Sequence, residues 1–267
     1  MLEIKNLTHT YPDGTEALKD VSFTVKDGEF LVVIGLSGSG KSTLLRCINR
    51  LIDPTSGTII WNGSDATALK HNQLRTLRRE IGMIFQHFNL VKRSNVITNV
   101  LAGRLGYVNP LASLLGQFPA ADKKKAAAAL ERVGLTPQAR KRADELSGGQ
   151  QQRVGIARAL MQDPKMILAD EPVASLDPVL AHTILGYLED LNKESGITVI
   201  CSLHYLDLVQ RYSTRVIGLR DGRLVYEGTR EEIQGMTDSE FKEIYGEEAE
   251  RINAGSISGG KVEADDE

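Results

Sequence analysis

The sequence predicts an α/β fold in which a mostly parallel sheet is joined by an N-terminal antiparallel β-layer and an inserted helical subdomain. Residues 1–30 alternate between apolar and polar side chains around Asp-Gly turns, a pattern typical of antiparallel strands. Later apolar runs, such as 30–34 and 81–85, are continuous and alternate with helical segments, as expected for a parallel sheet covered on both faces. Residues 87–162 change to a helical period, which predicts the inserted subdomain.

The predicted elements follow one another along the chain. The apolar run 30–34 leads through a glycine-rich turn into a helix that begins at Lys41. We expect a core from residues 1–86 and 163–248, a helical subdomain from 87–162, and a disordered tail at 249–267, which is polar, glycine-rich and acidic. The remaining expected elements are strands at 57–61, 165–170, 197–201, 214–219 and 224–227 and helices at 72–80, 179–194 and 205–211.

Composition indicates an ordinary soluble protein. The 267 residues are enough for one large α/β domain with a sizeable core, and 41% of them are hydrophobic. No apolar stretch approaches the roughly 18 residues that a membrane-spanning helix needs, and the first residues lack the features of a secretory signal, so we expect a cytoplasmic location.

The formal net charge of −3 gives no electrostatic reason to expect nucleic acid as a partner. Cys47 and Cys201 lack the spacing of a metal site and are expected in the core.

Residues 35–42 match the pattern G-x-x-x-x-G-K-[ST] of a phosphate-binding P-loop. The alternative, a chance glycine turn, is disfavoured because a strand precedes the motif and a helix follows it. Glycine permits left-handed backbone dihedrals, so the N–H groups of the loop can approach phosphate oxygens at the positive end of the helix dipole. This predicts a P-loop NTPase core that binds ATP, with Lys41 on the β- and γ-phosphates, Thr43 beside the α- and β-phosphates and Ser42 as a ligand of Mg²⁺. The predicted nucleotide-binding residues of the loop are Gly35, Ser37, Gly38, Ser39, Gly40, Lys41, Ser42 and Thr43.

Two acidic residues follow the apolar run 166–169, namely Asp170 and Glu171. Alternation along a strand would send their side chains to opposite faces, and we expect the turn that begins at Pro172 to re-aim the second one. Asp170 is then suited to hold Mg²⁺ through water, and Glu171 to polarise an attacking water molecule. A strand-end acid pair alone is as often structural, but a P-loop in the same sheet favours the catalytic interpretation.

The segment LSGGQ, residues 146–150, directly precedes another helical run. Ser147 could cap that helix, while Gly148 and Gly149 leave backbone N–H groups open to an anion. This predicts a second phosphate-binding helix start. An ordinary N-cap with flexible glycines explains the segment equally well until it is combined with the other motifs.

Taken together, these motifs resemble those of the ATP-binding cassette family, the nucleotide-hydrolysing subunits of ABC transporters. The resemblance covers the chain from about residue 2 to residue 245 and keeps the order of the family's motifs. For Tyr11 the residues alone slightly favour packing over a flat contact with adenine, and Tyr11 falls at the adenine-stacking position of the family. The other matches are residues 35–43, Gln86 as the Q-loop glutamine, LSGGQ at 146–150, MILADE at 166–171, Ser175, Leu176 and Asp177 as the D-loop, and His204 as the switch histidine.

The resemblance implies a composite active site in a homodimer. In the family two cassettes pair head to tail, so that the signature segment of each chain covers the ATP that is held by the P-loop of the other. Glu171, His204 and Gln86 are then the catalytic residues, and Gln86 joins Ser42 and Asp170 at Mg²⁺. The family's ATP contacts from the second chain fall on Ser147, Gly148, Gly149, Gln150 and Asp177.

The resemblance also implies a transporter with separate membrane partners. The helical region is where family members receive a coupling helix, so the expected partners are two transmembrane permease subunits and an extracytoplasmic solute-binding protein. The chain itself would be peripheral, at the cytoplasmic face of the membrane. Residues 101–106 and 171–178 are similar in sequence to the corresponding segments of the phosphonate-import branch of the family. This resemblance implies uptake of phosphonates, with phosphate or phosphite as further solutes.

Other functions within the family stay open at this point. Importers of polar amino acids share the segment that follows Gln86, and an exporter ATPase would carry the same catalytic motifs. Soluble members that act on ribosomes or DNA usually have two cassettes in one chain or a long inserted coiled coil. This sequence has one P-loop and no such insertion.

Overall fold

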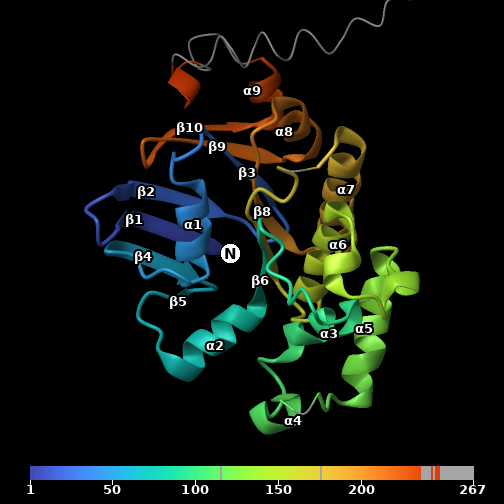
Figure 1. Cartoon of the computed structure of the whole chain (residues 1–267). Coiled ribbons are helices and arrows are strands. Elements are labelled where there is room, and N and C mark those ends of the chain that lie inside the picture. Colours follow the sequence, from blue (N-terminus) through green and yellow to red (C-terminus); the bar gives the residue numbers. More distant parts are fainter. Residues whose placement is uncertain (115, 175, 236–241, 243, 247–267) are drawn as a thin grey trace, which may run out of the picture.

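The computed structural model describes residues 1–114, 116–174, 176–235, 242 and 244–246. Ser175 of the expected D-loop and the expected tail at 249–267 lie outside these residues. Two β-sheets and a set of helices make up the described chain (Figure 1). The predicted α/β class is therefore confirmed, with one antiparallel and one mostly parallel sheet.

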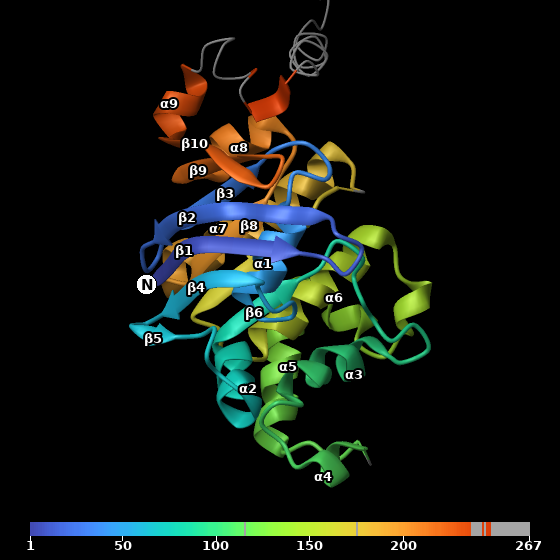
Figure 2. The same cartoon turned by 90° about the vertical axis from the view of Figure 1, so that its left-hand side faces the viewer.

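Sheet A is the antiparallel layer that the N-terminal alternation predicts. Its four strands run in the order β2-β1-β4-β5 and lie side by side toward the viewer in Figure 2. Leu2 pairs with Val25 and Ile4 with Phe23, and all four side chains are buried. Because successive side chains of a strand point to opposite faces, burying this set leaves the other face polar. The strands are β1 (Leu2–Thr10), β2 (Glu16–Val25), β4 (Ser56–Trp61) and β5 (Ser64–Asp65).

Sheet B has six strands in the order β10-β9-β3-β8-β7-β6. All neighbouring pairs are parallel except β9 and β10, which form an antiparallel hairpin. Every residue of β3, β6, β7 and β8 is buried, as continuous apolar runs require. The carboxyl ends of these strands meet at one edge, where the candidate site lies. The bounds are β3 (Phe30–Ile34), β6 (Ile81–Ile84), β7 (Met166–Ala169), β8 (Thr198–Ser202), β9 (Arg215–Arg220) and β10 (Arg223–Thr229).

Sheet B separates two hydrophobic cores. Leu31 and Val33 of β3 face one core, which α1 (Lys41–Ile48) and sheet A complete. Phe30 and Val32 face the other core, which helices on the opposite side complete. Burying an aliphatic side chain contributes roughly 1.5–3 kcal/mol, so both faces hold the sheet in place. The helices of the second core are α3 (Val96–Leu101), α5 (Ala120–Arg132), α6 (Gly148–Leu160), α7 (Pro178–Ser195) and α8 (Leu206–Tyr212).

The described part of residues 87–162 contains α3, α4 (Pro110–Leu114), α5 and α6, with three short 3₁₀ turns at Ala102–Arg104, Thr136–Gln138 and Ala143–Glu145. In Figure 1 these helices occupy the lower right of the molecule, beside α2 (His71–Glu80), which leads directly into β6. The short α9 (Arg230–Gln234) follows β10. No helix within the described residues has both the length and the apolar character needed to cross a membrane.

Candidate active site

The glycine-rich loop connects β3 to α1 through three left-handed glycines. Gly35, Gly38 and Gly40 have φ values of 143°, 81° and 106°. A Cβ on Gly35 would lie 2.2 Å from the carbonyl oxygen of Leu219, and one on Gly40 would lie 2.5 Å from that of Ala17. Side chains are therefore excluded at these two positions by packing as well as by dihedral angle. Gly40 caps α1 without a side-chain hydrogen bond, so the first N–H groups of the helix stay available to a ligand.

Lys41 is held inside this loop. Its ammonium group donates hydrogen bonds to the carbonyl oxygens of Gly35 at 2.9 Å and Leu36 at 2.8 Å, and it lies 3.9 Å from Glu171 Oε1. Burial lowers the pKa of Lys41 to about 8, against the attraction of Glu171 and Asp170, which raises it. Because this ammonium group is shielded from water, a nearby anion stabilises its charged form strongly.

Ser39 gives an independent sign that the loop is shaped for a ligand. Its hydroxyl oxygen is buried and has no hydrogen-bond partner, although buried polar atoms normally have one. Ser37 and Gly38 beside it are exposed. An anion bound in the loop would supply the missing partner for Ser39, so the residues present fit a phosphate group.

Ser42 and Asp170 meet at the start of α1. The Ser42 hydroxyl donates to Asp170 Oδ1 at 2.7 Å, and Asp170 is 1% exposed. Among the described residues there is no cluster of three or more His, Cys, Asp or Glu side chains suited to a metal ion. A divalent ion here would depend on this hydroxyl, this carboxylate, water and ligand oxygens, which is the donor set that Mg²⁺ accepts.

The backbone changes direction at Glu171, just after the end of β7. β7 ends at Ala169, one residue earlier than expected, and Glu171 has a left-handed φ of 45°. The expectation that the turn at Pro172 re-aims the side chain is therefore wrong, because the change of direction occurs at Glu171 itself. A left-handed non-glycine residue costs roughly 1–3 kcal/mol, and such residues are enriched at active sites.

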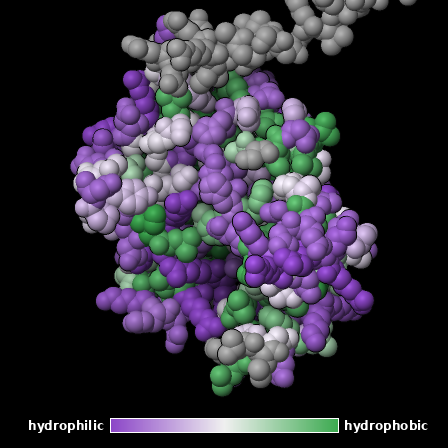
Figure 3. All heavy atoms as spheres, viewed as in Figure 1, coloured by the Kyte–Doolittle hydropathy of each residue, from purple (hydrophilic) through white to green (hydrophobic). Residues whose placement is uncertain are grey.

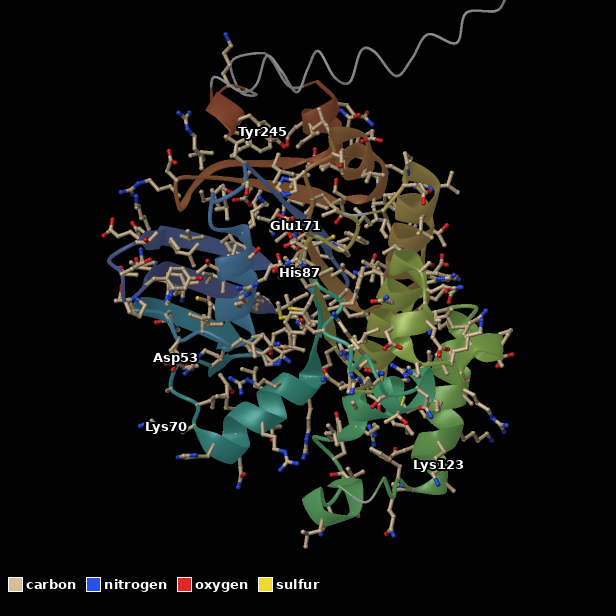
Figure 4. All side chains as sticks on the ribbon, in the orientation of Figure 1. Asp53, Lys70, His87, Lys123, Glu171 and Tyr245 are labelled. Atoms are coloured by element: carbon tan, nitrogen blue, oxygen red, sulfur yellow. The ribbon has the colours of Figure 1, made fainter. Side chains whose placement is uncertain are left out.

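Gln86 and His204 both contact the Glu171 carboxylate. Gln86 Nε2 donates to Oε2 at 3.0 Å, and His204 Nε2 donates to Oε1 at 2.5 Å. The hydrogen bond from His204 lowers the pKa of Glu171, against burial, which raises it, and the charge of Lys41 lowers it further. Glu171 is thus held as a carboxylate near the centre of the molecule (Figure 4).

Tyr11 contacts the P-loop helix α1 through Thr43. Its hydroxyl lies 3.0 Å from Thr43 Oγ1, and its ring packs edge-on against His9 at 4.6 Å between centroids. Tyr11 is only partly buried. The packing suggested by the residues alone is therefore present, and the aromatic face stays next to the loop.

The LSGGQ segment lies on the other side of sheet B. Ser147 caps α6, since its hydroxyl accepts from the N–H of Gln150 at 3.4 Å and the Gln150 side chain accepts from the N–H of Ser147 at 3.1 Å. α6 packs into the core opposite to that of α1. A Cβ on Gly149 would lie 2.0 Å from Leu180 Cδ2 of α7. Asp177 caps that helix by accepting from the N–H of Leu180 at 3.0 Å.

Comparison with known proteins identifies the chain. The sequence model of the ABC transporter family matches residues 18–174. The chain belongs to the ABC transporter family. A relative named phosphonates import ATP-binding protein PhnC 3, from Halalkalibacterium halodurans, is 49% identical over 98% of this chain and 99% of its own length. A second protein of that name, PhnC from Bdellovibrio bacteriovorus, is 51% identical over 96% of this chain and 98% of its own.

Solved structures of ABC cassettes are similar over most of the chain. The ADP conformation of the cassette MJ1267 is 31% identical, covers 96% of this chain and 98% of its own, and gives a TM-score of 0.79. A dimeric post-hydrolysis state of the cassette MJ0796, bound to ADP and Pi, is 36% identical, covers 86% of this chain and 99% of its own, and gives a TM-score of 0.77. The predicted P-loop NTPase fold is thus confirmed.

Two residues of this ABC cassette site escaped the sequence analysis. The buried Ser202 at the end of β8 accepts from the N–H of Glu171 at 2.8 Å and lies 3.3 Å from Asp170 Oδ1. Arg46 lies 3.7 Å from Asp170 Oδ2. Ser202 could have been found because it is a polar residue at the end of a buried strand. Arg46 could have been found because it lies four residues after Ser42 and therefore on the same helix face.

Proposed function

We propose that this chain hydrolyses ATP as the ATP-binding subunit of a phosphonate importer. The curated relatives of about 50% identity bear that name over almost the whole chain. The observation that carries the chemistry is the convergence of Lys41, Gln86 and His204 on the Glu171 carboxylate.

The site residues suggest a division of labour in hydrolysis. The loop N–H groups and Lys41 would bind the phosphates of ATP and stabilise the charge that develops on them. Glu171, kept ionised by His204, would accept a proton from the attacking water, and Gln86 would orient that carboxylate. Ser42 and Asp170, with Gln86 nearby, would hold Mg²⁺, which supplies charge neutralisation when bound. Tyr11 would stack on adenine.

A head-to-tail homodimer would complete this site. Ser147, Gly148 and Gln150 surround the start of α6, while the P-loop helix α1 packs on the opposite face of sheet B. The P-loop of one chain would bind one ATP, and the signature segment of the same chain would contact the ATP held by its partner. A two-fold axis would then generate two equivalent sites. The dimeric MJ0796 structure supports this arrangement. Gly149 and Asp177 would join the second chain's contacts.

The membrane partners follow from the importer function. We propose that two permease subunits bind the helical subdomain, residues 87–162, and that the core, residues 1–86 and 163–248, moves against it when ATP binds. The chain would be peripheral at the cytoplasmic face, and an extracytoplasmic protein would deliver the solute. Nothing in its charge suggests a nucleic acid partner.

Transport in a reconstituted system tests the proposal. The chain would be purified with the permease encoded beside it, placed in liposomes, and assayed for ATP hydrolysis with the solute-binding protein and methylphosphonate. We expect the loaded binding protein to stimulate hydrolysis and Glu171→Gln to abolish it. Equal hydrolysis with and without methylphosphonate, but stimulation by another solute, would contradict the proposed specificity.

A further inference from the structure

We propose that a cavity beside α2 binds a doubly charged oxyanion group of the phosphate or phosphonate class. The cavity has a volume of about 190 Å³ and is lined by eight residues from α2, from the segment after α3 and from the segment after α6. None of the eight is acidic, and none belongs to the site around Glu171. The proposal concerns a second site and does not depend on the proposed transport function.

Three arginines of α2 bring positive charge to this cavity. Arg75, Arg78 and Arg79 follow the spacing i, i+3, i+4 and so share one helix face. Within the described part of the chain, no carboxylate lies within 4 Å of their guanidinium groups. Each guanidinium has five N–H donors, of which only one or two are used. Their acceptors are the backbone oxygens of Leu105 for Arg75, of Asn49 and Arg50 for Arg78, and of Gly106 for Arg79.

Carboxylates close to the cavity are paired with other groups, and Asp163, next to the lining residue Gln162, is paired with Lys125. Glu80, the next residue of α2, accepts from Trp61 Nε1 at 2.7 Å and from Lys165 Nζ at 2.9 Å. Arg104, which lies behind the cavity, is paired with Asp122 at 2.9 Å. The charge of Arg104 is thus compensated within the chain, whereas that of the three α2 arginines is not.

The donors are held in position before any ligand arrives. Arg79 stacks on one ring, that of Tyr107, at 4.5 Å from its centroid, and Arg104 stacks on the same ring at 3.9 Å. Arg79 Nε is buried and has no hydrogen-bond partner. Gly106 leaves the space beside it open, since a Cβ there would lie 3.4 Å from that nitrogen. Gln162 Oε1, also buried and unpartnered, belongs to an amide that can turn its NH₂ group toward an anion.

Charge and size decide the class of ligand. A phosphate-type group carries about −1.5 to −2 charges and three acceptor oxygens, which matches three unpaired guanidinium groups better than a carboxylate with one charge and two oxygens. Arginine forks bind such oxygens in pairs. A water occupies about 30 Å³ of liquid, so a cavity of about 190 Å³ has room for one tetrahedral oxyanion. The group can come from a free ion or from a lipid headgroup.

Calorimetric titration of the full chain tests the free ion. Lys41→Ala is introduced first, so that the P-loop does not compete for the probe, and inorganic phosphate and methylphosphonate are titrated separately. We expect saturable binding at one site, weakened roughly ten- to a hundredfold by Arg79→Gln, the scale of losing a hydrogen bond to a charged group. Arg140→Gln, which removes the same charge from an exposed position, should change the affinity by less than about twofold.

Vesicle sedimentation tests the lipid source. Binding to vesicles that contain phosphatidic acid, whose phosphomonoester carries up to two charges, but not to phosphatidylcholine vesicles, would assign the site to a headgroup if it is lost in Arg79→Gln and kept in Arg140→Gln. If neither free ion binds and no sedimentation depends on Arg79, the proposal is overturned. Equal losses in the two arginine variants would overturn it too, because they would indicate binding to general surface charge.

A separate assay distinguishes failure of the proposed anion site from failure of ATP hydrolysis. Arg79→Gln in the otherwise unchanged chain should retain basal ATP hydrolysis in phosphate-free buffer, since the cavity is remote from Glu171. Arg79→Lys should restore part of the anion affinity, because it keeps the charge but loses the fork. A full loss of folding in Arg79→Gln would show in its circular dichroism, and Arg75→Gln then serves as the second variant, with the same expected direction.

Discussion

The hydroxyl of Ser202 accepts a 2.8 Å hydrogen bond from the backbone N–H of Glu171. It thereby holds the one residue of the acid pair that has left-handed dihedrals, with a φ of 45°. Ser202 is 0% exposed, so no water replaces the bond if the hydroxyl is removed. The carboxylate of Glu171 is thus aimed from β8 as well as from its own strand.

Removing that hydroxyl should slow catalysis without weakening nucleotide binding. In Ser202→Ala the buried N–H of Glu171 loses its acceptor, which costs about 1–3 kcal/mol, so we expect kcat to fall roughly ten- to a hundredfold and the affinity for ATP to change less than about twofold. Steady-state hydrolysis and a binding titration measure the two effects. Ser213→Ala removes an equally buried hydroxyl that donates to Val209 O at 2.7 Å and should leave kcat unchanged. A matching drop in ATP affinity for Ser202→Ala would show that this serine serves binding instead.

Glu171→Gln should separate binding from hydrolysis. The amide keeps the shape and the contact with Gln86 but cannot accept a proton, so we expect hydrolysis to fall by about 10² or more while ATP still binds. ATP should then hold two chains together, which light scattering during size-exclusion chromatography would detect. Glu189→Gln, in which the altered carboxylate pairs with Lys193 at 2.6 Å, is the matched control. A variant that stays monomeric at saturating ATP would count against the shared site.

Binding of ATP should weaken at alkaline pH because of Lys41. Burial lowers the pKa of Lys41 to about 8, while the last proton of a phosphate is lost near pH 6, so only the lysine titrates above neutrality. Since the anion requires the charged ammonium group, affinity should fall toward tenfold per pH unit above about pH 8. Lys41→Arg stays charged throughout, and its residual affinity should be flat across this range. A constant affinity of the unchanged chain from pH 7.5 to 9.5 would refute the assignment.

The same lowered pKa affects folding in the opposite direction. Between about pH 8 and the ordinary lysine value of 10.5, the unfolded chain binds the proton of residue 41 and the folded chain does not. The contribution of Lys41 to stability therefore rises with pH across this window. Urea unfolding of the nucleotide-free chain at several pH values, compared with Lys41→Met, isolates this contribution. A free energy of unfolding of the unchanged chain that rises with pH relative to that of Lys41→Met confirms the sign, and one that falls refutes it.

His204→Ala should move the acid limb of the rate profile. The hydrogen bond from His204 is the largest cause that lowers the pKa of Glu171, so its loss raises that pKa. Glu171 would then be protonated at higher pH, and kcat should begin to fall at a higher pH on acidification. Profiles of kcat against pH measure the shift, with His182→Ala as control because His182 pairs with Tyr212 at 3.0 Å, away from the site. An acid limb at the same pH in both proteins would exclude this role.

The surface agrees with a protein that binds partners through limited regions. On the face seen in Figure 3, hydrophobic residues gather in small separate groups between larger hydrophilic areas. Leu105, Tyr107 and Leu111 are exposed by 48%, 38% and 74%, and all three follow α3 near the basic cavity. A contact with another protein here would remove these apolar side chains from water.

The sequence by itself determined the elements and the local motif. Eight consecutive residues define the P-loop, and their geometry is local, so Gly35, Gly40 and Lys41 could be assigned from spacing alone. Sheet B and sheet A can also be distinguished in the sequence. Strands buried on both faces appear as continuous apolar runs, whereas strands buried on one face alternate between apolar and polar residues.

Only the tertiary structure decided what Glu171 touches. Its partner Gln86 follows β6, whereas Ser202 ends β8 and His204 lies just after it. These strands flank β7 because of the order β8-β7-β6, and no periodicity in the chain encodes that order. The left-handed turn at Glu171 and the packing of α6 opposite α1 likewise depend on contacts between distant segments. Local propensity specifies each element, whereas long-range packing specifies which ends of those elements meet.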